Sequence, residues 1–233
     1  MITAWSPSRL AVWENCPAQA KYKFVLRLPE PPAPALDRGT RIHAEAEKYI
    51  LGDDKRVPAD LVKVTDEIEL LRKGYKKGRV RVEQSLALNA QWSPTDWFGK
   101  DAWLRCKIDV VEVGKAGGKK KLVQEAIVTD WKTGKNNARD SEKHGDQLNL
   151  YALAVISSGI AETVRARLIF TDTGEVVTKE AGCLTTREIP ATRMHWEKRV
   201  APMMNDEEFN PNPNFTCRWC AWAKAKGGPC RFG

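Results

Sequence analysis

The sequence lacks the features that mark membrane and secreted proteins. No apolar run in its 233 residues approaches the length needed to cross a bilayer. The first ten residues, MITAWSPSRL, have no apolar segment of the kind that a secretory signal peptide contains. Internal repeats and low-complexity tracts are also missing. We therefore expect an intracellular, cytoplasmic protein that does not act on membranes.

Long linkers rich in proline, serine or glycine are missing too. The nearest candidate, residues 29–34, is short and lies close to the N-terminus, which is typical of a bend between elements. A hydrophobic content of 42% over this length is enough for one sizeable core. We expect a single domain over residues 1–233. Its parts are a helical part at 1–78, a core at 79–204 and a cysteine-rich tail at 205–233.

Positive charge is in excess, with a formal net charge of +8. Such an excess favours a polyanionic partner, and nucleic acid is the commonest one, although a basic surface can also serve solubility alone. The basic residues occur in two runs, one at 72–81 and one at 115–121. Beside an active site, runs of this kind bind phosphates with a strong salt dependence.

Hydrophobic periodicity predicts an α/β order of elements. Ser6 and Pro7 have the residue types of a helix N-cap and first position, and the Cys16-Pro17 pair should interrupt that helix before it resumes at 18–26. Further helices are expected at 38–51, 60–75, 148–156 and 190–204, and the helix at 148–156 should bury one stripe of apolar side chains. Strands are expected at 79–89, 103–113, 122–133 and 164–170. A turn at 114–121 should join the second strand to the third, and a short partner strand should follow the last one. This order suits a mixed sheet flanked by helices.

Two carboxylates and a lysine form the first candidate site. Asp130 and Lys132 are two residues apart on an expected strand, so their side chains point to the same face. Asp109 lies on the preceding strand of the same hairpin, close enough for its carboxylate to approach Asp130. Two such carboxylates can bind a hard divalent cation, and a lysine beside the cation can stabilise developing negative charge. Taken alone, an Asp-x-Lys pair is more often a surface ion pair than a catalytic site.

Four motifs in order extend this site. They are GTRIH at 39–43, IDVV at 108–111, VTDWKTG at 128–134 and QLNLY at 147–151. Together they resemble the core of the RecB-like PD-(D/E)XK nucleases, which include CRISPR-associated RecB-like exonucleases and related phage proteins. The resemblance covers about residues 5–232. It implies a restriction-endonuclease-like fold and a DNA nuclease that depends on Mg²⁺ or Mn²⁺, an exonuclease in DNA recombination, repair or processing.

The resemblance also implies roles for individual residues. Lys132 would be the catalytic lysine, acting together with Asp109 and Asp130. The metal ligands would be His43, Asp109 and Asp130, with the Trp131 carbonyl as a further candidate. Gln147 and Tyr151 would support the site and contact DNA. Glu83 could match a glutamate that the family often has on the strand before the hairpin. One departure is the Lys107-Ile108 pair, which replaces the proline that gives the motif its name.

The cysteines form the second candidate site. Cys217, Cys220 and Cys230 are crowded into the last 17 residues, and the C-x-x-C spacing is common to zinc sites and iron–sulfur clusters. Cys16 is the candidate for a fourth ligand. One N-terminal and three C-terminal cysteines also resemble the arrangement in RecB-like nucleases with an iron–sulfur cluster, which implies a [4Fe–4S] cluster. Zinc and free thiols are the alternatives. Cys106 and Cys183 are expected to be buried as small apolar side chains.

The sequence thus predicts a DNA nuclease in which a metal centre links the N-terminal segment to the cysteine-rich tail. The alternative from a different class is a non-catalytic nucleic-acid-binding protein with the same metal-stapled tail. Against it, the Asp109, Asp130 and Lys132 set is complete. An enzyme acting on another phosphoester fits the basic charge less well. Single- or double-strand preference, polarity and protein partners are not predicted.

Overall fold

The protein is described by a computed structural model that covers residues 1–30, 34–118, 121–137 and 141–232. The chain forms two compact units. The larger is Pro34–Arg193, and the smaller combines Met1–Ala33 with Met194–Gly233. None of the described helices is both long and apolar enough to cross a membrane.

The larger unit is built on a mixed five-stranded sheet in the order β1-β2-β3-β4-β5. Its strands are β1 (Val80–Leu88), β2 (Leu104–Gly118), β3 (Lys121–Lys132), β4 (Thr163–Phe170) and β5 (Glu175–Thr185). All neighbours are antiparallel except β3 and β4, which are parallel. A parallel pair needs a crossover connection, and here it contains α5 (Ser141–Ser157).

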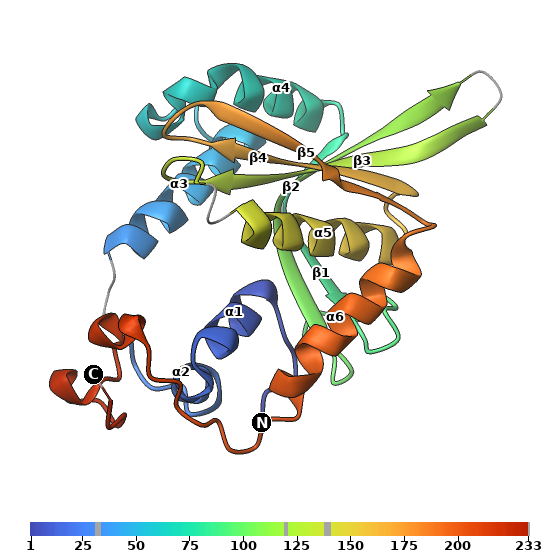
Figure 1. Ribbon diagram of the computed structural model, residues 1–233. Helices are drawn as coiled ribbons and strands as arrows, with labels where there is room; N and C mark the ends of the chain where they lie inside the picture. Colours follow the sequence, from blue (N-terminus) through green and yellow to red (C-terminus); the bar gives the residue numbers. More distant parts are fainter. Residues whose placement is uncertain (31–33, 119–120, 138–140, 233) are drawn as a thin grey trace. The chain divides into compact units, whose positions relative to one another are not determined.

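Helices cover the two faces of this sheet. The chain enters the unit through α3 (Pro34–Leu51), a 3-10 turn at Ala59–Val64 and α4 (Thr65–Lys76). Figure 1 shows α4 on one side of the sheet and α5 on the other, with the far ends of β2 and β3 projecting as a two-stranded ribbon. A buried cluster joins α3 and α4 to the sheet; it comprises Ile42, Ala46, Tyr49, Ile50, Leu61, Val64, Ile68, Leu71, Val80, Val110, Trp131 and Ile169.

Close packing between α4 and β1 depends on a glycine. A Cβ added at Gly74 would stand 2.6 Å from Cγ2 of Val80, which is itself buried. Gly74→Ala is therefore expected to destabilise the protein by about 1–2 kcal/mol, although alanine is the better helix former. Urea unfolding measures the change. Adding Val80→Ala should remove the clash, so additive effects of the two substitutions would contradict this explanation.

The smaller unit joins both ends of the chain. Its N-terminal part holds α1 (Pro7–Asn15), α2 (Pro17–Ala20) and a π-helical turn at Lys21–Val25. The Ser6 hydroxyl accepts a hydrogen bond from the amide of Arg9, as its expected capping role requires, and the helix breaks at Cys16. From the C-terminal part come most of α6 (Ile189–Met204) and 3-10 turns at Phe215–Trp219 and Lys224–Lys226.

Ring stacking and ion pairs hold the two ends together. The rings of Trp5 and Trp196 stack with centroids 5.6 Å apart. Arg199 pairs with Glu14 at 2.7 Å, and the Trp13 indole donates to Asp206 at 2.7 Å. Segments nearly 200 residues apart in sequence therefore share one small core.

Several predictions from the sequence about the strands and helices are wrong. The expected turn at 114–121 is mostly strand, because pairing continues from Gly114↔Glu125 to Gly118↔Lys121. The last strand is not short, since β5 has eleven residues and pairs with β4 from Thr163↔Thr185 to Phe170↔Glu175. Helix α5 is buried beyond its expected stripe, with Leu150, Leu153 and Ala154 fully covered as well. Lys119 and Lys120 lie outside the described residues, as do the side chains of Lys121 and Cys183.

Candidate active site

Strand β3 presents Asp130 and Lys132 as a pair. Trp131, between them, is buried in the α3–α4 cluster and anchors the strand. Strand alternation then directs both flanking side chains to the opposite face. The Lys132 ammonium lies 2.7 Å from Oδ2 of Asp130. This confirms that the two side chains are adjacent, as the strand pattern predicted.

Strand β2 brings Asp109 to the same place. Its pairing with β3 extends as far as Val110↔Thr129. Immediately beyond, Oδ2 of Asp109 accepts a hydrogen bond from the backbone amide of Trp131 at 2.8 Å. Asp109 is buried, and the other oxygen of its carboxylate lies 3.2 Å from Nδ1 of His43 on α3. One oxygen is thus fixed by the sheet, while the other faces the histidine.

Helix α5 supplies two side chains that hold this pair. Gln147 accepts a hydrogen bond from Lys132 at 3.0 Å and reaches Asp130 at 3.5 Å through its amide nitrogen. The same nitrogen donates to the Tyr151 hydroxyl at 2.7 Å. Residues four apart on a helix share a face. A chain of polar contacts therefore runs from Tyr151 through Gln147 to Asp130 and Lys132.

Glu83 joins the site through an unusual backbone conformation. Its φ is 50°, in the left-handed region that glycine favours. Its carboxylate, Nδ1 or Nε2 of His43 and a carboxylate oxygen of Asp109 all lie within 4.8 Å of one another. It also pairs with Lys107. A non-glycine residue held in this region costs about 1–3 kcal/mol, and such residues cluster at functional sites.

The strain at Glu83 is measurable by comparing two substitutions that both remove the carboxylate. Glu83→Gly should be more stable than Glu83→Ala by about 1 kcal/mol, because alanine resists the left-handed conformation. In an ordinary strand the order is opposite, and the alanine variant is more stable than the glycine variant. Free energies of unfolding from urea titration in EDTA provide the comparison. Equal or greater stability of the alanine variant would show that the backbone relaxes at no cost.

Burial and mutual charge shift the acid–base behaviour of the site. Burial and the charge of Asp109 raise the pKa of Asp130 to about 6, against the opposing effect of Lys132. Burial lowers the pKa of His43, but the hydrogen bond to Asp109 and the surrounding carboxylates outweigh it, so that pKa is raised. Burial raises the pKa of Tyr151 well above its ordinary value. Crowded carboxylates of this kind gain from a bound cation.

The loop after β3 is fixed by residues that the sequence did not single out. Oδ2 of Asp172 accepts a hydrogen bond from the amide of Gly134 at 2.8 Å, and Arg38 on α3 pairs with the same carboxylate at 2.6 Å. Those bonds and the Arg38 guanidinium lower the pKa of Asp172. They hold the start of α3 beside the loop that follows Lys132. No motif spacing marks Asp172, because it acts through a bond to a backbone amide.

The four candidate cysteines of the smaller unit are free and partly buried, and Cys16, Cys217 and Cys230 are near enough to Cys220 to act on its charge. Burial raises the pKa of Cys220, and the charges of Cys230, Cys16 and Cys217 raise it further. Burial raises the pKa of Tyr22, and the nearby Cys230, Cys16 and Cys220 raise it further. Backbone amides donate to two of the sulfurs, Asn212 to Cys16 and Asn214 to Cys217, each at 3.4 Å. By contrast, Cys106 is fully buried in the sheet, as expected.

Comparison with known proteins identifies the family of this chain. The family model for the PD-(D/E)XK nuclease superfamily matches residues 4–225. The chain therefore belongs to the PD-(D/E)XK nuclease superfamily. Among solved structures it is similar to the crystal structure of SSO0001, with 16% identity, a TM-score of 0.45 and coverage of 99% of this chain and 87% of that one. No curated protein matches the sequence.

Proposed function

We propose that the protein is a divalent-metal-dependent DNA nuclease, acting as an exonuclease, with its active site at Asp109, Asp130 and Lys132. The observation that carries the proposal is one assembled cluster. The potential ligand atoms of His43, Glu83 and Asp109 converge within 4.8 Å, and Asp130 pairs with Lys132 beside them. Superfamily membership supports phosphodiester hydrolysis as the reaction.

The donor set fits Mg²⁺ or Mn²⁺. Carboxylate oxygens suit both ions, and an imidazole nitrogen favours Mn²⁺ over Mg²⁺. His43, Asp109 and Asp130 would hold the ion, and we now add Glu83, which converges with the first two. A bound divalent ion would polarise a phosphoryl oxygen and lower the pKa of a bound water. The raised pKa of Asp130 is consistent with this role, because a cation relieves the repulsion that causes it.

The protein's own groups then do the positioning. Lys132 supplies a positive charge next to the carboxylates, where it can orient a water and stabilise charge that develops on the phosphate. Gln147 holds the Lys132 ammonium and Tyr151 holds Gln147, so the lysine is placed before substrate arrives. Preorganised donors of this kind need no reorganisation during the reaction.

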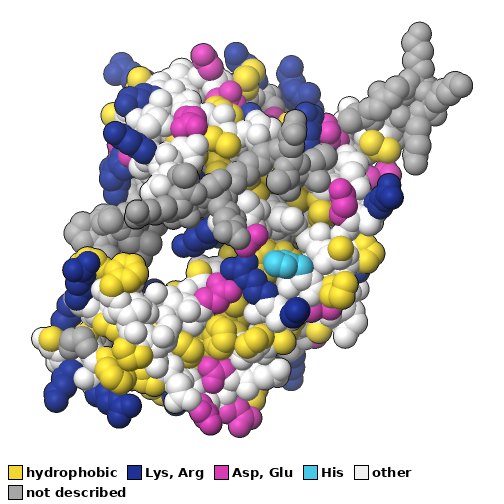
Figure 2. Space-filling view, viewed as in Figure 1, with side chains coloured by type: hydrophobic (Ala, Val, Ile, Leu, Met, Phe, Trp, Pro, Cys, Tyr) yellow, Lys and Arg dark blue, Asp and Glu magenta, His cyan; other side chains and the backbone are white. Residues whose placement is uncertain are grey.

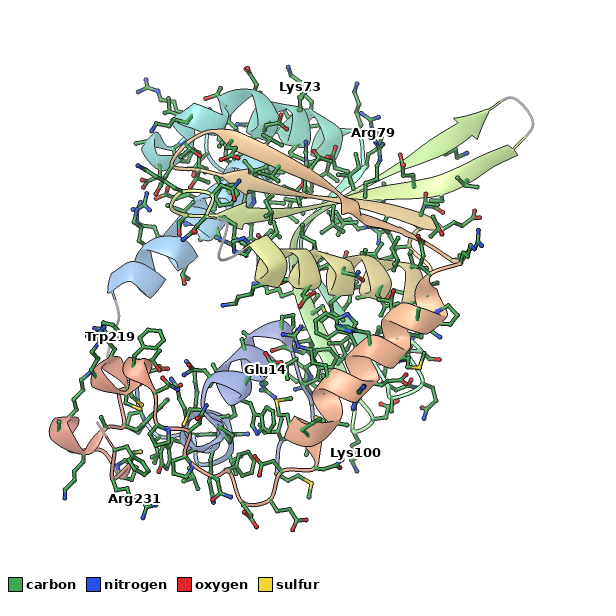
Figure 3. All side chains as sticks on the ribbon, viewed as in Figure 1. Glu14, Lys73, Arg79, Lys100, Trp219 and Arg231 are labelled. Carbon is green, nitrogen blue, oxygen red and sulfur yellow. The ribbon has the colours of Figure 1, made fainter. Side chains whose placement is uncertain are left out.

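A basic surface supports nucleic acid as the substrate. Exposed cations follow the end of α4 and the start of β1; they are Lys73, Lys76, Lys77, Arg79 and Arg81. Lys73 and Arg79 point away from the sheet (Figure 3), and Figure 2 shows Lys and Arg side chains gathered over this part of the larger unit. Arg72 of the same run has a structural role, since it lies over the Tyr49 ring and donates to the Asp54 carbonyl.

Cleavage of end-labelled DNA tests the function. Purified protein is incubated with single- and double-stranded oligonucleotides in Mg²⁺, Mn²⁺ or EDTA. We expect products only with a metal ion, and progressive shortening from an end rather than internal cuts. A closed circular substrate should resist. Binding without cleavage in either metal would favour the non-catalytic alternative, and cutting of the circle would replace the exonuclease by an endonuclease.

We further propose that Cys16, Cys217, Cys220 and Cys230 hold one metal centre, a [4Fe–4S] cluster. Tetrahedral zinc requires thiolates about 3.8 Å apart, because its bonds to sulfur are about 2.3 Å long. Among the described residues, no three cysteine sulfurs lie within 4.8 Å of one another. A cubane binds each thiolate at a different iron and so accepts wider spacing. The four thiols fit that arrangement better than zinc.

A further inference from the structure

The cysteine-rich segment exposes two aromatic rings, Phe215 and Trp219, that have no part in the proposed active site. Phe215 and Trp219 begin and end one 3-10 turn and are 75% and 60% exposed. Their ring centroids are 6.2 Å apart at an interplanar angle of 90°. In between, Arg218 places its guanidinium 3.8 Å from the centroid of the Trp219 ring. Because neither ring is buried, the two together leave a large apolar surface in contact with water, and such surfaces mark interaction sites.

The backbone under these rings is fixed. Asn214 caps the turn by accepting from the amide of Thr216 at 2.9 Å, and its amide group donates to the carbonyl of Asn15 at 3.0 Å. Asn15 also donates to the Thr216 hydroxyl at 3.2 Å. Cys217, in the middle of the turn, accepts from the Asn214 amide. The rings are therefore presented by a braced turn rather than by a loose tail.

The charged side chains within this segment are all basic. Residues 209–232 contain four basic residues and no acidic one. All four are exposed: Arg218, Lys224, Lys226 and Arg231. On the preceding loop, Asp206 accepts hydrogen bonds from the Trp13 indole and from the amides of Glu208 and Phe209. Glu207 and Glu208 are exposed there, just before the basic segment begins. Trp219 and Arg231 lie at opposite edges of this segment (Figure 3).

Exposed aromatic faces among cations are what single-stranded nucleic acid requires. Unpaired bases stack on aromatic rings and on guanidinium planes, while cations follow the phosphates. A duplex hides its base faces and gains only from the charges. We propose that Phe215, Arg218 and Trp219 form a stacking platform for the bases of single-stranded DNA. The proposal rests on the proposed function, since it assigns the strand form that this nuclease engages.

Binding of a labelled 20-nucleotide thymidine strand to the full-length protein tests the platform. Asp130→Ala is included throughout to prevent cleavage, and fluorescence anisotropy reports the affinity. Trp219→Ala should weaken binding by about tenfold, within the range for removal of one base stack, with Phe215→Ala similar and Trp219→Phe close to the parent. Phe98→Ala is the matched control, because Phe98 is 88% exposed on the other unit; it should change nothing.

Two further ligands and the salt dependence separate stacking from charge. An abasic strand of equal length keeps the phosphates and removes the bases, so Trp219→Ala should not weaken its binding. Trp219→Ala should likewise leave the affinity for a duplex unchanged. Trp219→Ala should leave the slope of log affinity against log salt unchanged, whereas Lys224→Ala with Lys226→Ala should flatten it by about 0.7 for each phosphate that is no longer neutralised.

Some outcomes would overturn the platform. One is unchanged affinity of the Phe215→Ala and Trp219→Ala variants for the thymidine strand. Another is equal weakening on the abasic strand. A third is a dimer in sedimentation that Trp219→Ala dissociates without affecting DNA, which would make the rings a contact between copies. The nuclease proposal fails separately, if protein with Asp130 intact cleaves no DNA in Mg²⁺ or Mn²⁺ while the ring-dependent binding remains.

Discussion

Lys132→Ala is expected to lower the rate of DNA cleavage at saturating substrate by about a hundred- to a thousandfold or more, as loss of one preorganised electrostatic group does in other enzymes. The ammonium lies 2.7 Å from Asp130 and is held by Gln147. No other described lysine pairs with Asp130 in the structure, so nothing replaces its charge. Single-turnover cleavage of an end-labelled strand in Mn²⁺ gives the rate without product release.

DNA binding should survive this substitution, because most of the basic surface is elsewhere. Asp130→Ala should abolish cleavage, and its binding should be equal or tighter, since the carboxylate that it removes repels phosphate. Lys135→Ala is the matched control, an exposed lysine three residues along the same segment. It should affect affinity at most and leave the rate at saturation unchanged. Full turnover by Lys132→Ala, free of contaminating nuclease, would reject the catalytic assignment.

Gln147→Leu should separate positioning from chemistry. The amide contacts Lys132, Asp130 and Tyr151 and is not expected to touch metal. Its loss should slow cleavage less than Lys132→Ala, while metal dependence stays the same. Tyr151→Phe removes only the last bond of the chain, and so it should have the smaller effect of the two.

The sequence could predict the parts of this site that lie on regular elements. Strand alternation places Asp130 beside Lys132, and hairpin pairing brings Asp109 to them; both follow from period two alone. Helix spacing likewise aligns Gln147 with Tyr151. These residues are adjacent in the structure because local geometry requires it.

Other parts could not be predicted, because they depend on tertiary contacts or special backbone conformations. The resemblance named Glu83 as a possible match, but no residue type signals the positive φ with which it reaches His43 and Asp109. Asp172 acts through the amide of Gly134, 38 residues away in sequence. The length of the β2–β3 ribbon was also missed, since its glycines and lysines favour a turn locally. Continuous cross-strand pairing overrides that preference.

Cys16→Ala is expected to damage folding more than chemistry. If the four cysteines share one centre, the link from residue 16 to residue 217 closes a loop of about 200 residues. Restraining so long a loop in the unfolded chain is worth on the order of 5 kcal/mol in the entropic model developed for disulfides. That is a large share of the stability of an ordinary domain. Metal binding would then be part of the folding free energy.

Each of the four Cys→Ala variants should therefore be poorly soluble and lose its metal. Cys106→Ala is the control, because Cys106 is buried in the sheet and far from the other thiols in sequence. It should keep full metal content even if burial makes it less stable. Protein purified without oxygen should be brown, with broad absorption at about 400 nm that Cys16→Ala abolishes.

Elemental analysis decides the identity of the centre. Iron and acid-labile sulfide in the parent protein, absent together from Cys16→Ala and Cys217→Ala, would support the cluster. Colourless protein with one equivalent of zinc would keep the metal link between the two ends of the chain and reject the cluster. If neither metal is present and Cys16→Ala folds normally, no metal links the two ends. Their association would then rest on contacts already seen, such as Trp5 on Trp196 and Glu14 with Arg199.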